Sequence, residues 1–148
     1  MEHNDKKIAI TCARFNPEIT QKLLKGAKEA LLAAGVSENN ILVFECPGAV
    51  ELPILMKNAL LRDEVVGGIA LGCVIQGETK HFDYVAGECS HGLMQVMLAL
   101  NKPVAFGVLT TMDEAQAHAR AGKGSANKGY ECAEVLLEML NTLEQVRA

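Results

Sequence analysis

Apolar residues along the chain fall into two alternating patterns. Short continuous apolar runs rich in β-branched residues predict β-strands. These runs cover residues 7–13, 40–46, 67–75 and 102–110. The third run, "GGIALGCVI", is apolar throughout, which is typical of a strand covered on both faces.

Between the runs, apolar residues recur at the spacing of an α-helix. Asn16 and Pro17 are typical of a helix N-cap followed by proline in the first turn, and Gly35 is typical of the end of that helix. Further helices are expected from "PGAVELP" to about residue 61, over 85–100, from an Asp113 cap to about residue 121, and at the C-terminus. The last helix is expected to share one apolar face among Cys132, Val135, Leu136, Met139 and Leu143.

Strand and helix therefore alternate from one end of the chain to the other. This order predicts right-handed βαβ units and a parallel sheet between layers of helices. We expect an α/β fold, specifically a three-layer α/β/α sandwich with a central four-stranded parallel sheet of the flavodoxin-like type. The sequence has no linker or internal repeat, so we expect a single domain over residues 1–148, with a polar N-terminal arm at residues 1–6.

Composition and charge exclude several classes of protein. The chain has 148 residues, of which 49% are hydrophobic and 22% charged, enough for a sizeable core. Its net charge of −4 and its lack of a basic run argue against nucleic-acid binding. The polar start "MEHNDKK" is not a signal peptide, and no apolar run approaches the roughly 18 residues of a membrane span. We expect a cytoplasmic protein without membrane contact.

The cysteines are scattered and form no C-x-x-C pair, so we interpret them as small buried hydrophobic residues and not as disulfide or zinc ligands. They are Cys12, Cys46, Cys73, Cys89 and Cys132. Cys73 is the exception, because its place at a strand end allows it to line a site. Three histidines show no metal-ligand spacing with one another and are expected at the surface, namely His3, His91 and His118. No metal site is expected.

Candidate chemistry gathers where the predicted strands end, which is where open parallel sheets bind ligands. Phe15, flanked by Arg14 and Asn16, either stacks on a planar ligand or anchors its loop by hydrophobic contact. Glu51 starts the second helix, where a carboxylate interacts favourably with the helix dipole. Its alternative role is to accept hydrogen bonds from a polyol or an amine.

The stretch "GETKHFDYV", residues 77–85, joins the third strand to a helix. Gly77 allows the backbone to approach a ligand, and the amides of Glu78 and Thr79 precede the helix, as in phosphate sites. His81 follows, and imidazole exchanges protons near neutral pH. This histidine is either a general acid/base or merely exposed, and Lys80 is interpreted as a solvated charge.

A second group lies near the C-terminal third of the chain. Phe106 lies within the fourth strand, so its pattern alone favours core packing. Arg120, Lys123 and Lys128 surround the loop "GKGSANKG", which matches neither a Walker A motif nor a dinucleotide fingerprint. These cations are still able to bind a phosphate.

Five motifs in this order resemble the lumazine synthase family over about residues 7–143. They are "RFN", "PGAVELP", "LGCVIQGETKHFDYV", "FGVLTT" and "RAGKGSANKG". The resemblance implies condensation of 5-amino-6-(D-ribitylamino)uracil with 3,4-dihydroxy-2-butanone 4-phosphate. The product is 6,7-dimethyl-8-ribityllumazine, a riboflavin precursor, and phosphate is released. No metal or organic cofactor is implied.

For the pyrimidine substrate, the resemblance implies that Phe15 stacks on the ring and that Glu51 binds the ribityl chain. Further contacts to this substrate, largely through the backbone, are implied for Ala49, Val50, Cys73, Val74 and Ile75. For the second substrate, the resemblance implies that Glu78 and Thr79 bind the phosphate and that His81 is the general acid/base.

The resemblance also implies that the site is shared between neighbouring subunits of a pentamer. The adjacent subunit would supply Phe106 to close the ring pocket, Arg120 to pair with the phosphate and Lys128 as a further polar contact. Some family members assemble into a 60-subunit icosahedral shell, and the sequence does not choose between the assemblies. Riboflavin synthase is a further partner to consider. A lysine common in the family is displaced by one place to Lys123, which leaves its role open.

Two other functions use the same features. One is a lumazine- or flavin-binding shell protein without turnover, and the other is a flavodoxin-like module that binds FMN. The second needs a phosphate loop after the first strand, and "ARFNPE" is a poor one. The combination of phosphate-binding groups with His81 favours the enzyme.

Overall fold

The computed structural model describes residues 5–148, and its centre is a parallel sheet. Residues 1–4, which include His3 and most of the expected N-terminal arm, lie outside the described part. The strands are β1 (Lys7–Ala13), β2 (Ile41–Cys46), β3 (Val65–Ile75) and β4 (Val104–Thr111). They pair in the order β2-β1-β3-β4, and every pairing is parallel. The expected four-stranded parallel sheet is confirmed, and its order agrees with the first four strands of flavodoxin-like sheets.

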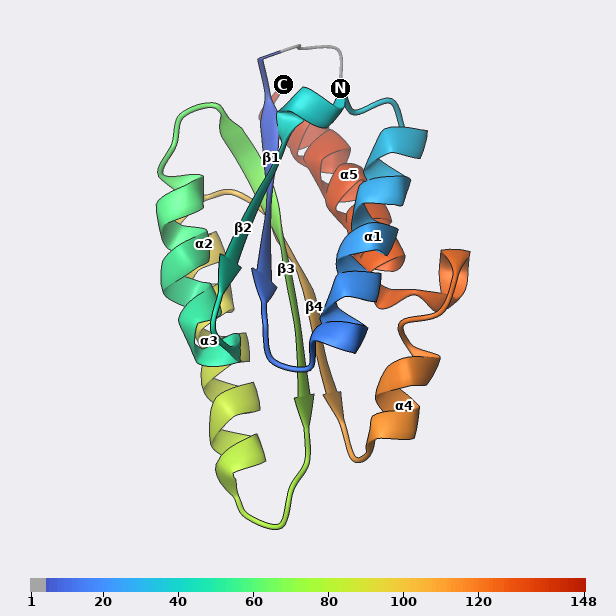
Figure 1. The fold of residues 1–148 in the computed structure, drawn as a ribbon. Coiled ribbons are helices and arrows are strands. Elements are labelled where there is room, and N and C mark those ends of the chain that lie inside the picture. Colours follow the sequence, from blue (N-terminus) through green and yellow to red (C-terminus); the bar gives the residue numbers. More distant parts are fainter. Residues whose placement is uncertain (1–4) are drawn as a thin grey trace.

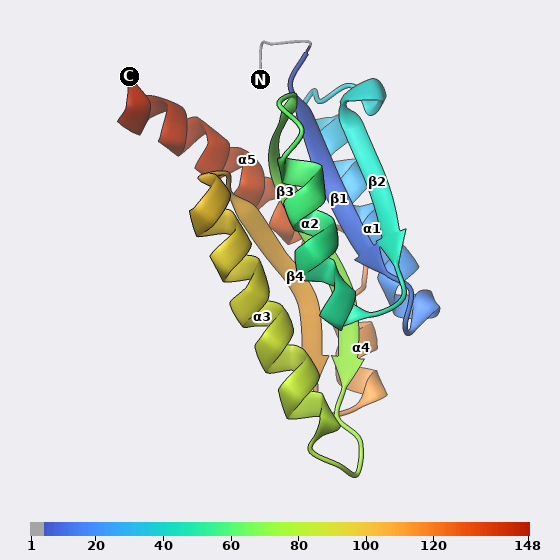
Figure 2. The same ribbon diagram turned by 90° about the vertical axis from the view of Figure 1, so that its left-hand side faces the viewer.

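Helices cover both faces of this sheet (Figures 1 and 2). The face that carries α1, α4 and α5 lies opposite the face that carries α2 and α3. The helices are α1 (Pro17–Ala33), α2 (Leu52–Leu60), α3 (His81–Leu100), α4 (Glu114–Ala119) and α5 (Lys128–Arg147), with short 3-10 turns at Glu38–Asn40, Ala49–Glu51 and Gly124–Ala126. The three-layer arrangement is therefore as expected.

The core consists of two apolar clusters, one on each face of the sheet. Alternation along β1 sends Ile8 and Ile10 into the cluster with Leu23 of α1 and Leu136 of α5, and sends Ala9 into the cluster under α2 and α3. Each of these five residues is at most 1% exposed. A covered sheet of this kind explains why the β3 sequence lacks polar residues.

α1 and α5 pack closely because α5 has a glycine at the contact. A Cβ atom on Gly129 would collide with the backbone carbonyl of Leu23. The Asn127 side chain caps α5 by accepting from the Tyr130 N–H at 3.1 Å, and it also donates to the Lys22 carbonyl of α1 at 3.0 Å. One small residue and one bridging amide thus set the approach of the two helices.

The structure corrects one local expectation and confirms two others. Asn16 occupies the N-cap position of α1, but its side chain makes no cap hydrogen bond, and its backbone is left-handed, with φ 59°. Val135 and Met139 are 45% and 41% exposed, so they do not share the buried face of α5. Asp113 does cap α4, because its Oδ1 accepts from the Gln116 N–H at 2.8 Å.

The carboxyl end of β3 extends beyond its neighbour β1. Pairing with β1 stops at Cys12 and Leu71, whereas pairing with β4 continues to Ile75 and Thr111. Residues 73–75 therefore leave one backbone edge uncovered on the β1 side. This edge forms part of the candidate site. Among residues 5–148, no helix has both the length and the apolarity needed to cross a membrane.

Candidate active site

A cavity of about 460 Å³ lies at the carboxyl ends of β1, β2 and β3, within the size range of small-molecule sites. It brings together most of the residues expected to contact the pyrimidine, as well as His81. Its lining consists of Phe15, Asn16, Gly48, Ala49, Val50, Glu51, Cys73, Val74, Ile75, His81 and Val85.

Phe15 is held at the mouth of this cavity by its backbone. The Arg14 N–H donates to the Cys46 carbonyl at 2.9 Å, and the Phe15 N–H donates to the Pro47 carbonyl at 3.2 Å. These bonds join the loops that follow β1 and β2. The Phe15 side chain nevertheless remains 72% exposed. An exposed aromatic ring on a fixed backbone is suited to stacking on a planar ligand.

Gly48 leaves an opening between the aromatic ring and a carboxylate. A Cβ atom at this position would lie 3.7 Å from Cδ2 of Phe15 and 3.6 Å from Oε1 of Glu51. Glu51 is half-buried and directly precedes α2. Burial raises the pKa of the neighbouring Cys46 thiol, and the negative charge of Glu51 raises it further. The cavity thus has an apolar stacking wall beside a hydrogen-bond acceptor.

The uncovered edge of β3 forms another wall. The Asn16 Nδ2 atom donates to the Cys73 carbonyl at 2.9 Å, which ties the loop after β1 to this strand end. Burial raises the pKa of the Cys73 thiol to about 11, so the thiol is neutral at physiological pH and is a poor nucleophile. The contribution of Cys73 is therefore its backbone, together with that of Val74 and Ile75.

His81 is the first residue of α3 and is exposed at the cavity. Its backbone N–H donates to the Thr79 hydroxyl oxygen at 3.3 Å, which shapes the turn before the helix. Among residues 5–148, the amides of Glu78 and Thr79 make no backbone hydrogen bond, so they are available to an anion. Both residues are exposed and lie outside the lining of the cavity.

Phe106, Arg120 and Lys128 lie in a different place. They line a second cavity of about 560 Å³ with Val108, Leu109, Thr110, Thr111, Ser125, Ala126 and Glu131. Phe106 is 38% exposed, so the core packing favoured by its strand pattern is wrong for this chain. The Arg120 Nη1 atom donates to the Gln116 carbonyl at 3.2 Å, and Lys128 Nζ lies 3.5 Å from a Glu131 carboxylate oxygen. Within one chain, these three residues do not join His81.

Three lining residues were missed by the sequence prediction, namely Asn16, Gly48 and Val85. The sequence placed Asn16 at a helix cap, which is correct for its position but hides its bond to Cys73. Lys123 lines neither cavity. It borders a separate groove between α1 and the loop before α5, together with Lys22 and Lys25.

The sequence was also compared with models of known protein families. The model of the 6,7-dimethyl-8-ribityllumazine synthase family matches residues 5–144, nearly the whole chain. The chain belongs to the lumazine synthase family. Membership agrees with the motif resemblance and with the parallel sheet.

Proposed function

We propose that the chain is a lumazine synthase. It condenses 5-amino-6-(D-ribitylamino)uracil with 3,4-dihydroxy-2-butanone 4-phosphate to form 6,7-dimethyl-8-ribityllumazine and releases phosphate and water. The observation that carries this proposal is the grouping of Phe15, Glu51, an open strand edge and His81 around one cavity of about 460 Å³. Family membership over residues 5–144 supports it independently.

Each wall of the cavity has a role in this reaction. Phe15 stacks on the pyrimidine ring, the backbone of residues 73–75 binds the polar edge of the ring, and Glu51 accepts hydrogen bonds from the ribityl hydroxyl groups. Ala49 and Val50 complete this side of the pocket through their backbone. A ring held in this way presents its free amine in a fixed direction, which lowers the entropic barrier of condensation.

The second substrate is placed beside His81. The free amides of Glu78 and Thr79 precede α3, and helix N-termini attract phosphate through the helix dipole and unpaired N–H groups. His81 transfers protons during imine formation, phosphate elimination and ring closure. All three steps are proton transfers and carbonyl chemistry, for which an imidazole is suited.

The residues of the second cavity would take part in this reaction through self-association of the chain. We infer that a neighbouring subunit of a pentamer brings Phe106, Arg120 and Lys128 against the first cavity. Phe106 would then close the ring pocket, and Arg120 would pair with the phosphate. Two observations support this: the three residues lie away from His81 in one chain, and the Phe106 ring is 38% exposed on β4. Disrupting the pentamer by dilution or by interface substitutions should then abolish turnover.

The test is to mix the purified protein with both substrates, without added metal, and to follow formation of the fluorescent lumazine. A protein-free control measures spontaneous condensation. The expected result is a clear excess over this control. His81→Ala should slow turnover by up to roughly 10²–10⁴-fold if His81 carries the full acid/base duty. His91→Ala is the matched control, because His91 is an exposed histidine of the same helix that does not line the cavity.

Two outcomes would contradict parts of the proposal. An unchanged rate in the His81→Ala variant would remove the acid/base assignment and leave positioning of the substrates as the source of rate. No excess over the control, with lumazine or riboflavin still bound, would indicate a binding protein of this family without turnover.

A further inference from the structure

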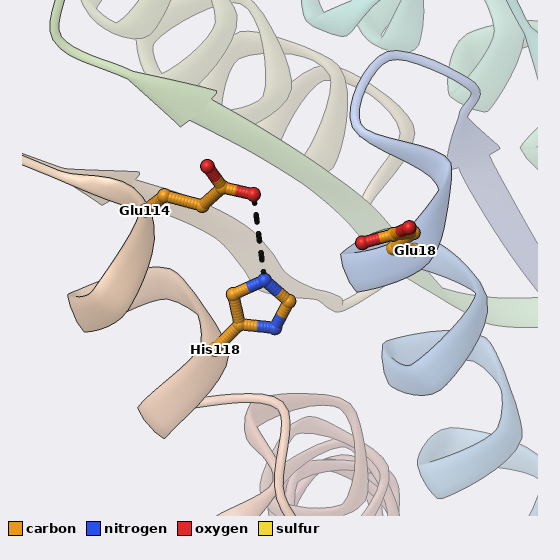
Figure 3. A group of neighbouring side chains, drawn as sticks. All are labelled: Glu18, Glu114 and His118. Carbon is orange, nitrogen blue, oxygen red and sulfur yellow. Dashed lines mark ion pairs between the residues drawn. The ribbon is translucent and has the colours of Figure 1, made fainter.

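Two helices bring three possible metal ligands together close to the candidate active site but outside the lining of its cavity. Glu18 is in the first turn of α1, and Glu114 and His118 are one helical turn apart on α4. One ligand atom from each side chain lies within 4.8 Å of the other two. Figure 3 shows the three side chains, with Glu114 and His118 on α4 and Glu18 on the facing helix. None of them lines either cavity of the proposed reaction.

Ordinary helix chemistry explains each residue singly but does not explain the group. Acidic residues are favoured in the first turn of a helix. Glu114 and His118 also form an i,i+4 pair, with 3.5 Å between Oε1 and Nε2. Neither effect accounts for Glu18 approaching this pair from another helix, because two nearby carboxylates repel each other. In the described part of the chain, no lysine or arginine forms an ion pair with Glu18 or Glu114.

We propose that Glu18, Glu114 and His118 form a Zn²⁺ site. Zinc binds imidazole nitrogen and carboxylate oxygen at about 2.0–2.2 Å, so ligand atoms at the corners of a tetrahedron are about 3.4 Å apart. The Oε1–Nε2 distance of 3.5 Å already corresponds to this spacing. The remaining separations, at most 4.8 Å, need only a small closing movement of the Glu18 side chain, which is exposed and free to rotate.

The composition of the site favours zinc over the hard divalent cations. Mg²⁺ and Ca²⁺ take oxygen ligands, whereas the imidazole of His118 suits zinc. Two carboxylates also supply the negative charge that balances the ion. Three protein ligands leave the fourth position to water.

Bound zinc would tie α1 to α4, which lie on the same face of the sheet (Figure 1). α4 ends at Ala119 and is followed directly by Arg120, so the ion would hold the segment that positions Arg120. This is a structural role, and it stands whether or not the chain is a lumazine synthase. Zinc bound only to the folded state also raises thermal stability, by an amount that grows with the logarithm of the free zinc concentration once this exceeds the dissociation constant.

The test uses the full chain without an affinity tag, after chelator treatment and removal of the chelator. Zinc binding is measured by competition with a chromophoric zinc indicator, and thermal unfolding is measured with and without zinc. We expect one zinc per chain and a zinc-dependent rise in Tm, with a much smaller effect of Mg²⁺. His118→Ala and Glu18→Gln should each weaken zinc binding by about tenfold or more, since even residues behind a metal ligand contribute that much.

His91→Ala is the matched control and should bind zinc as the unmodified chain does. The Tm values without zinc show whether each variant is folded, and Glu18→Gln changes charge while keeping the shape of the side chain. The proposal is overturned if the unmodified chain binds no zinc. It is also overturned if His118→Ala and Glu18→Gln retain zinc affinity and the zinc-dependent rise in Tm.

Discussion

Asn16 offers the sharpest test of how the fold builds the candidate site. Its backbone is left-handed, with φ 59° and ψ 59°, and its side chain donates to the Cys73 carbonyl at 2.9 Å. Asparagine tolerates this conformation better than most residues, and its amide closes the gap between the β1 loop and the uncovered end of β3. Replacing Asn16 therefore changes both the backbone preference and the contact between two walls of the cavity.

Two substitutions separate these effects. Asn16→Gly removes the amide but keeps an easy left-handed backbone, so it leaves the Cys73 carbonyl without its partner and should destabilise by about 1–3 kcal/mol. Asn16→Ala also places a Cβ atom in a left-handed backbone, which adds about 1–2 kcal/mol. The free energy of unfolding should therefore fall in the order asparagine, glycine, alanine.

Asn101 is the matched control. It is also left-handed, with φ 54°, and it caps the C-terminus of α3 far along the chain from the site. Its Oδ1 atom accepts from Arg147 Nη2 at 3.2 Å in an exposed pair, which stabilises little. Asn101→Gly should therefore cost less than Asn16→Gly, and the difference measures the bond to Cys73.

The assay is urea unfolding of each variant, together with titration of riboflavin or lumazine into the folded protein. Asn16→Gly should weaken ligand binding, because the Phe15 loop and the β3 edge lose their link, whereas Asn101→Gly should not. Equal unfolding free energies for the two glycine variants, with unchanged ligand affinity, would refute the reasoning.

Three further predictions concern stacking, helix packing and pH. Phe15→Ala should weaken binding of lumazine or riboflavin by about 1–3 kcal/mol, the usual value of a stacked base, while Phe15→Tyr should retain it; equal affinity of both variants would exclude stacking. Gly129→Ala should strongly lower the midpoint of urea unfolding, because the new Cβ atom collides with α1. Gly87→Ala should raise the midpoint slightly, because Gly87 lies in α3 with open space around it and alanine favours the helix. The reverse order would contradict this packing. Burial raises the pKa of the Cys89 thiol from 9.0 to about 12, so between these pH values the unfolded thiol ionises while the folded one stays protonated. Stability should therefore fall above pH 9, with a contribution from Cys89 of about 1.4 kcal/mol per pH unit, and unfolding from pH 8 to 10.5 should show a shallower slope in a Cys89→Ala variant.

Local patterns in the sequence were sufficient for the elements and for their order. Apolar runs predicted every strand of the sheet, and helical spacing predicted every α-helix that covers it. Both signals are local, because hydrophobic periodicity and turn chemistry depend on neighbouring residues. The parallel arrangement followed from strands separated by helices, and it placed Phe15, Glu51 and His81 near the same edge. The Asp113 cap was predictable for the same reason, since a cap needs only the next turn of the helix.

Long-range geometry settled what these patterns left open. The register of β3 leaves residues 73–75 unpaired on the β1 side, where the Asn16 side chain binds the Cys73 carbonyl. No local signal in the sequence encodes how far one strand extends beyond its neighbour. The same register places Phe106 on the exposed side of β4, in a cavity apart from His81. Burial on α5 was misjudged because Val135 and Met139 have apolar side chains at helical spacing, yet they are 45% and 41% exposed.

The proposed zinc ligands on α1 and α4 were also beyond the reach of local sequence patterns. His118 was weighed only against other histidines, whereas its partners in space are carboxylates. One partner lies a helical turn away, where spacing reveals it, and the other, Glu18, starts a helix at the opposite end of the chain. The sequence shows which chemical groups are available. The packing of the helices against the sheet decides which of these groups come into contact. That packing depends on the burial of many apolar residues in both clusters of the core, so local patterns do not reveal it.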